Sequence, residues 1–240
     1  MVTALILSGG IGSRMCSDIP KQYIEVGGIP VIAYCIRTLS ESDRIDAIWI
    51  VAASEWQEKI HQWLGASDTY RKFKGFSMPG ANRQMSVLNG IRDIKSSLPD
   101  TEYVMIHDAA RPMITAADIE KYIAAAEGHD GVLPVLPMKD TVYLSDDGAR
   151  VSGLLDRNQI FAGQAPEVFA LDKYLKANES LIDNAKGDAD SAIMKINGST
   201  EPAIMAGMDI VMVPGSEDNF KITTMADLNR FQAMIEKGMA

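Results

Sequence analysis

Short apolar runs alternate with longer amphipathic stretches along this chain. The apolar runs predict buried strands at residues 3–7, 45–53, 104–106, 132–136 and 209–213. Helical spacing of apolar side chains predicts helices at residues 30–40, 55–64, 81–94 and 116–127. Strands that alternate with helices indicate an α/β fold, here a Rossmann-like, mostly parallel sheet flanked by helices.

Residues 140–155 depart from this alternation. They contain two short strand-like runs around Asp146-Asp147-Gly148, and Asp-Gly is a strong signal for a hairpin turn. Because an isolated two-stranded hairpin is marginal in water, this one needs a partner. A second subunit is the simplest partner, and packing back on its own domain is the alternative. We expect one domain over residues 1–240, with the hairpin inserted in it.

Composition limits the classes of partner. The chain of 240 residues has a net charge of −9, so it lacks the basic footprint that a nucleic-acid groove requires. It has no run of 18 apolar residues and no signal-peptide pattern, so we expect no membrane partner and a cytoplasmic location. Cys16 and Cys35 have no metal-site spacing and are consistent with a reducing compartment.

The most distinctive motif follows the first predicted strand. Three glycines in Gly-Gly-Ile-Gly precede Arg14, and Pro-Lys-Gln places Lys21 soon after. Glycines after a strand let the backbone approach a ligand and offer N–H groups to anions. The loop is not a P-loop, which needs a Gly-Lys pair, nor a dinucleotide fingerprint, whose third glycine is Met15 here. It predicts a polyphosphate site; a plain turn with two solvated cations is the alternative.

Asp108 and Arg111 follow another predicted strand, in the segment His-Asp-Ala-Ala-Arg-Pro. Ligands of α/β sheets bind beyond the carboxyl ends of strands, so Asp108 and the glycine loop should face one crevice. The Asp108 carboxylate could hold Mg²⁺, and the Arg111 fork suits a phosphate. The alternative is an Asp108–Arg111 pair that only shapes the loop.

Two further segments contribute candidates. Gly80 and Ser86 lie at a predicted helix start, where N–H groups attract anions, although a plain helix start is the better interpretation of this stretch taken alone. Lys221 and Thr223 alternate with an isoleucine, so on a strand they would share one face and could hold a phosphate. Thr224 is predicted to cap the last helix, with an acid three residues later.

Taken together, these motifs resemble the cytidylyltransferase family that includes 2-C-methyl-D-erythritol 4-phosphate cytidylyltransferase and ribitol-5-phosphate cytidylyltransferase. The resemblance extends from Ala4 to about Gln232 and rests on GGIGSRM…PKQY, GANRQMSV, HDAARP, KDTVY, LLDRNQIFAGQAPEVF and DNFKITT…DL. It implies transfer of CMP from CTP to a polyol phosphate, with release of pyrophosphate. The first choice of acceptor is 2-C-methyl-D-erythritol 4-phosphate, of the non-mevalonate isoprenoid pathway, and Ala110 favours it modestly over ribitol 5-phosphate.

The resemblance also implies roles for individual residues. Nucleotide binding is implied for Leu7, Ser8, Gly9, Gly10, Gly12, Gly80, Arg83, Ser86, Asp108 and Ala109. Catalysis is implied for Arg14, Lys21, Arg157 and Lys221. Binding of the acceptor is implied for Arg111, Thr141, Arg157, Asp188, Lys221 and Thr223. Mg²⁺ is the implied cofactor, with Asp108 as its ligand. The hairpin becomes the arm of a homodimer, which brings Thr141 and Arg157 toward the partner's site.

The chain departs from the family pattern at several positions. Ala81 replaces an aspartate, Ala165 and Glu167 replace Thr and Gln of Gln-Thr-Pro-Gln, Gly187 replaces a threonine, Cys16 replaces a glycine, and residues 198–202 resemble a short insertion. The lost hydroxyls leave the acceptor open. A catalytically idle nucleotide- or sugar-sensing module is the other alternative, but such a module would be expected to lose Arg14, Lys21 or Lys221.

Overall fold

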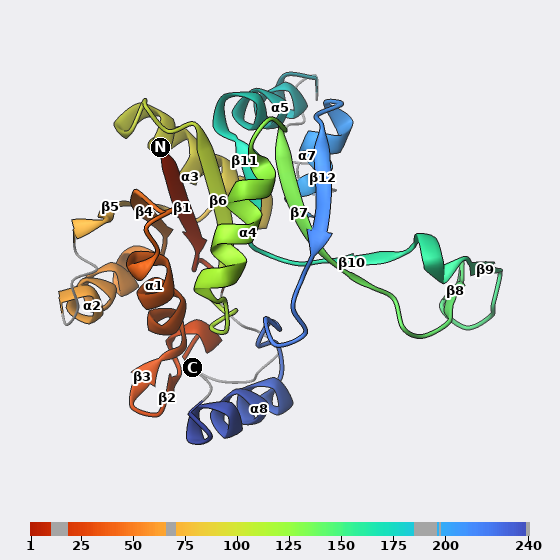
Figure 1. The fold of residues 1–240 in the computed structure, drawn as a ribbon, viewed down its shortest axis with the longest axis horizontal. Coiled ribbons are helices and arrows are strands. Elements are labelled where there is room, and N and C mark those ends of the chain that lie inside the picture. The colour runs from red at the N-terminus through yellow and green to blue at the C-terminus, as the bar shows by residue number, and fades with distance from the viewer. Residues whose placement is uncertain (11–18, 66–70, 185–195, 197, 239–240) are drawn as a thin grey trace.

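The structure is a computed structural model that describes residues 1–10, 19–65, 71–184, 196 and 198–238. In these residues eight strands form one sheet, in the order β10-β7-β11-β6-β1-β4-β5, with β12 paired in parallel to β7 (Figure 1). The strands are β1 (Val2–Leu7), β4 (Ala47–Val51), β5 (Phe73–Ser77), β6 (Tyr103–Asp108), β7 (Gly131–Pro137), β10 (Phe161–Gly163), β11 (Glu167–Ala170) and β12 (Ile210–Pro214). Only β10 and β11 run antiparallel to their neighbours, so the predicted mostly parallel sheet is confirmed.

Helices cover both faces of the sheet (Figure 1). They are α1 (Val31–Glu41), α2 (Ser54–Gly65), α3 (Arg83–Ser97), α4 (Ala116–Ala126), α5 (Leu171–Asn184) and α7 (Thr200–Met205). The last helix, α8 (Met225–Glu236), packs away from the sheet, in a third apolar cluster with Val26, Val31 and Tyr34. Successive strand side chains point to opposite faces. Ala4 and Ile6 of β1 therefore pack in the core under α1, α2 and α4, whereas Leu5 packs in the core under α3, α5 and α7. The two apolar clusters, one on each face of the sheet, hold the strands in place and so position the residues at the strand ends.

The expected strands and helices are all present, with shifted ends. β6 extends through Asp108, so this carboxylate lies in the last strand residue and not beyond it. α3 begins at Arg83 and not at residue 81, because the Asn82 side chain caps it by accepting from the Met85 N–H at 2.8 Å. No pattern in the sequence predicted β5, β10, β11, α5 or α7.

The strand suggested for Lys221 and Thr223 is wrong. Residues 220–223 have no regular secondary structure. Ile222 anchors them instead, because it is fully buried and its N–H donates to the Ala110 carbonyl at 2.8 Å. The predicted cap of the last helix is confirmed: Thr224 and Asp227 form a capping box at the start of α8.

The hairpin is confirmed as β8 (Val142–Leu144) paired antiparallel with β9 (Gly153–Leu155). Gly148 has φ of 71°, which only glycine adopts easily. Figure 1 shows the hairpin projecting from the sheet at the end of β10, away from the helices. Tyr143 and Leu154 lie opposite each other and are 60% and 65% exposed, so the hairpin does not pack back on its own domain.

No helix among the described residues is both long and apolar enough to span a membrane. The cytoplasmic location stays a prediction.

Candidate active site

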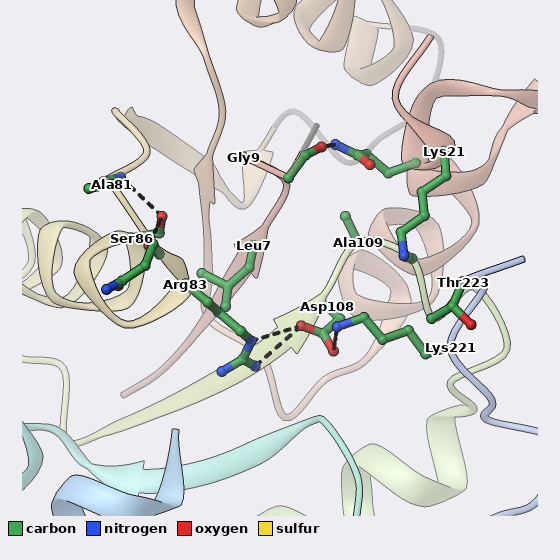
Figure 2. Close-up of a pocket in the computed structure, with 15 residues that line it drawn as sticks. Leu7, Gly9, Lys21, Ala81, Arg83, Ser86, Asp108, Ala109, Lys221 and Thr223 are labelled. Carbon is green, nitrogen blue, oxygen red and sulfur yellow. Dashed lines mark hydrogen bonds and ion pairs between the residues drawn. The ribbon is translucent and has the colours of Figure 1, made fainter. Parts of the chain in front are cut away.

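The glycine loop leaves the end of β1 and is pinned by the residues of the Pro-Lys-Gln motif. The Gln22 side chain is buried and its Nε2 donates to the carbonyls of Ser8 and Gly10, both at 2.8 Å. A Cβ on Gly9 would lie 2.5 Å from Pro79, so only glycine permits this close approach. Gln22 thus holds the loop while its neighbour Lys21 points into the cavity (Figure 2).

The start of α3 forms a second wall of the cavity. The Gly80 N–H donates to the Ser86 hydroxyl at 3.0 Å, and that hydroxyl donates to the Asn82 carbonyl at 2.8 Å. A Cβ on Gly80 would lie 2.8 Å from the Met85 carbonyl carbon, so a larger residue would disturb the first turn of the helix. The sequence therefore places Gly80 and Ser86 in direct contact at the edge of the cavity.

Asp108 lies at the centre of a cluster of cations. Its Oδ1 is 3.2 Å from Arg83 Nη2, and its Oδ2 is 2.9 Å from Lys221 Nζ (Figure 2). Oδ2 is also 3.5 Å from Arg111 Nε. Burial alone would raise the pKa of the Asp108 carboxyl, but Arg83, Lys221 and Arg111 together hold this pKa well below its ordinary value. Asp108 is therefore ionised at neutral pH.

A second carboxyl lies behind Arg83. Glu167 is 8% exposed, and its Oε2 is 3.8 Å from Arg83 Nη2 with no hydrogen-bond partner among the described residues. Burial raises the pKa of the Glu167 carboxyl to about 7, against a weaker lowering by Arg83. The neighbouring Asp108 charge adds to the increase. Glu167 thus keeps its proton to a higher pH than an exposed glutamate does.

One cavity of about 470 Å³ collects most of the predicted site residues. Its lining includes Leu7, Gly9, Gly10, Lys21, Gly80, Arg83, Ser86, Asp108, Ala109, Lys221 and Thr223. These come from the first strand, the Lys21 turn, α3, β6 and the segment before α8, so the expected single crevice is confirmed.

Other predicted residues lie elsewhere. Ser8 is buried, and its carbonyl accepts hydrogen bonds from the side chains of Gln22 and Tyr23. Arg111 does not line the cavity; it contacts Asp108 and donates to the Asn219 carbonyl at 2.7 Å. Thr141 and Arg157 are exposed at the base of the hairpin and do not line the cavity. Gly12, Arg14 and Asp188 lie outside the described residues, as do Cys16 and Gly187.

The residues present do not fit a resident Mg²⁺ ion. The described part of the chain contains no group of three His, Cys, Asp or Glu side chains that could hold a metal. Both oxygens of Asp108 already face cations. Mg²⁺ prefers several oxygen ligands, and it keeps waters and substrate phosphates where the protein supplies few.

Sequence reasoning missed the site roles of Gln22, Asn82, Glu167 and Ser199. Gln22 belongs to a motif that was recognised, and Asn82 has the residue type of a helix cap, so both carried a local signal. Glu167 and Ser199 carry none, because they reach Arg83 only through the tertiary fold.

A family profile described as 2-C-methyl-D-erythritol 4-phosphate cytidylyltransferase matches residues 2–237. The chain belongs to this family. A 2-C-methyl-D-erythritol 4-phosphate cytidylyltransferase of Clostridium acetobutylicum is 32% identical over 99% of this chain and 98% of its own length. A ribitol-5-phosphate cytidylyltransferase of Streptococcus agalactiae is 30% identical over 98% of this chain and 96% of its own length.

Solved structures of this cytidylyltransferase family share the fold. The crystal structure of a 4-diphosphocytidyl-2C-methyl-D-erythritol synthase from Anaerococcus prevotii has a TM-score of 0.81 and 25% identity, and it covers 98% of this chain and 96% of its own.

Replacing Glu167 by Gln should change how stability depends on pH. The carboxyl titrates near 4.5 when unfolded and near 7 when folded, so between these values the native state binds the extra proton. The wild type therefore loses stability from this group as the pH rises from about 4.5 to about 7. We expect the unfolding free energy of Glu167→Gln, measured by urea denaturation, to increase relative to that of the wild type as the pH rises across this window. The exposed Glu25→Gln is the control, and parallel pH curves for Glu167→Gln and wild type would contradict the assignment.

Proposed function

We propose that the chain transfers CMP from CTP to a polyol phosphate, with 2-C-methyl-D-erythritol 4-phosphate as the first choice of acceptor. The observation that carries the proposal is the meeting of Lys21 and Lys221 in one cavity, next to the glycine loop and α3. The family of the chain supports the same reaction.

The reaction depends on holding two anionic phosphates together and stabilising their charge, and it needs no proton transfer to a catalytic base. A phosphate oxygen of the acceptor forms a bond to the α-phosphorus of CTP, and the bond from that phosphorus to the β-phosphate oxygen breaks. The electron pair leaves with pyrophosphate. Because the attacking oxygen is already an anion, no general base is needed. Positioning and charge stabilisation supply the rate, as in other phosphoryl transfers.

His107 fits this account as a residue without a part in proton transfer. It is fully buried, and burial lowers the pKa of its imidazole to about 4, so it is neutral near pH 7. Its Nε2 lies 2.9 Å from the Arg111 carbonyl, which shapes the turn after β6.

Within the cavity, each part of the two substrates would bind to a different wall. Gly80 and Ser86 would receive the cytosine, and the loop from Leu7 to Gly10 and Lys21 would receive the triphosphate, together with Gly12 and Arg14. Lys221 would bind the acceptor phosphate. Thr223 donates both its N–H and its hydroxyl to Asp227, so in this arrangement its oxygen can only accept. Lys221 would therefore contribute more to binding the acceptor phosphate than Thr223 does.

We propose that Mg²⁺ binds together with CTP and is held mainly by the CTP phosphates. The shortage of free oxygen ligands at Asp108 supports this assignment over a resident ion.

Pyrophosphate release with CTP tests the function. We expect turnover with 2-C-methyl-D-erythritol 4-phosphate to exceed that with ribitol 5-phosphate, the acceptor for which the Streptococcus agalactiae relative is named. Lys21→Ala should lower kcat by on the order of 10²-fold, the effect of losing one preorganised charge-stabilising group. Lys176→Ala, an exposed lysine on α5, is the control. A wild-type protein inactive with both acceptors, or a fully active Lys21→Ala, would refute the proposal.

The hairpin, residues 140–155, would be the dimer arm of a single domain spanning residues 1–240. Thr141 and Arg157 do not reach the cavity of their own chain, and Arg157 Nη1 donates to the Lys139 carbonyl at 3.0 Å at the base of the arm. The exposed Tyr143 and Leu154 offer an apolar surface for a second copy. In a symmetric dimer each chain both gives and receives an arm.

Replacing residues 142–154 by a short glycine bridge should yield a monomer. Its affinity for the acceptor should fall, because the partner's Arg157 is lost from the site, whereas CTP binding at the glycine loop should largely survive. Sedimentation and calorimetric titration with CTP measure the two effects. The double variant Tyr143→Ser, Leu154→Ser removes the apolar pair while keeping the arm, with Met205→Ser as an exposed control on α7. A deletion variant that stays dimeric would contradict the shared site.

A further inference from the structure

The Arg83 guanidinium is held by three segments that lie far apart in the sequence. Nε and Nη2 face Asp108 Oδ1 at 3.4 and 3.2 Å. Nη1 donates to the hydroxyl of Ser199, which is fully buried beside α7. Nη2 also faces the Glu167 carboxylate at the start of β11. Arg83 therefore has no freedom to turn without losing a partner.

Ser199 and Glu167 are not part of the cavity wall. The Ser199 carbonyl accepts from the buried Tyr174 hydroxyl at 2.7 Å, which fixes the backbone that presents its side chain. Glu167 is fixed by the pairing of β11 with β6, opposite Ile106. Arg83 pairs with Oδ1 of Asp108, whereas Lys221 pairs with Oδ2.

Lys221 has two competing uses in the same place. Its ammonium is 2.9 Å from Asp108 Oδ2, yet the reaction needs that charge on a substrate phosphate. Lys221 can leave only if the buried Asp108 carboxylate keeps enough counter-charge, because an unpaired buried charge is costly. Arg83 and Arg111 are the two cations that remain on Asp108.

We propose that Ser199 and Glu167 are positioning residues that hold Arg83 against Asp108, so that Lys221 can move from Asp108 to the acceptor phosphate. This inference rests on the proposed function. Arg83 then serves as the permanent counter-ion of Asp108, and Lys221 as the exchangeable one. If Arg83 loosens, Asp108 keeps Lys221 and the site loses affinity for the acceptor.

Steady-state kinetics of Ser199→Ala test the proposal. We expect the KM for the acceptor that the wild type uses to rise roughly tenfold, the size expected when a hydrogen bond to a charged group is lost. The KM for CTP should stay within about twofold, because this inference gives Arg83 to Asp108 and not to the nucleotide, and the substitution changes neither the glycine loop nor Gly80. Ser199→Thr keeps the hydroxyl and should restore the wild-type KM. Thr200→Ala, a buried neighbour without a hydrogen bond to Arg83, is the control.

Glu167→Gln is the second variant, and it keeps the shape of the side chain. It should raise the KM for the acceptor in the same direction by a smaller factor, since Glu167 is farther from Arg83. In an Arg83→Lys background, Ser199→Ala should add little, because the Nη1 donor that it serves is gone. Urea denaturation shows whether each variant is folded at the assay temperature.

The outcomes separate this inference from the proposed function. A wild type with no polyol-phosphate-dependent pyrophosphate release refutes the function itself. An active wild type whose Ser199→Ala variant changes both KM values equally, changes neither, or loses only kcat refutes the exchange of Lys221. Additive effects of Ser199→Ala and Arg83→Lys would also refute it, since independent sites add.

Discussion

The buried carboxylate of Asp108 constrains the rest of the site. A charge in this position is tolerated only with counter-ions, and the fold brings three to it. Each cation comes from a different segment: Arg83 begins α3, Arg111 follows β6, and Lys221 precedes α8. The pairing thus ties one helix, one strand end and the segment before the last helix to a single point. The cavity forms between these ties and the glycine loop.

A local cluster of cations explains how an acidic chain can bind anionic substrates. The net charge of the chain is −9, but Lys21, Arg83 and Lys221 all line the same cavity. Arg83 faces Asp108, Glu167 and the hydroxyl of Ser199, and Lys221 faces Asp108. In the proposed reaction, the binding of two mutually repelling substrates would depend on how these cations are shared between the protein and the phosphates.

The sequence predicted what local patterns control. Apolar runs located the central strands, Asp147-Gly148 located the hairpin, and Thr224 located the cap of α8. It failed where the tertiary fold decides. The apolar–polar alternation around Ile222 suggested a strand, but that residue lies in a loop, where its side chain packs against α8 and its N–H donates to the Ala110 carbonyl. The contacts of Arg83 join residues 84 and 116 positions apart, and no local pattern reports a pairing of that kind.

The unfolding free energy of Asp108→Asn tests most directly whether this carboxylate organises the cluster. The substitution keeps the shape of the side chain and leaves three partly buried cations without their anion. We expect the unfolding free energy to fall by about 3–5 kcal/mol in urea denaturation, the usual cost of removing one partner of a buried ion pair. Asp172→Asn is the matched control: its exposed ion pair with Lys95, at 2.6 Å, should be worth no more than about 1 kcal/mol. An Asp108→Asn protein no less stable than the Asp172→Asn control would contradict the account.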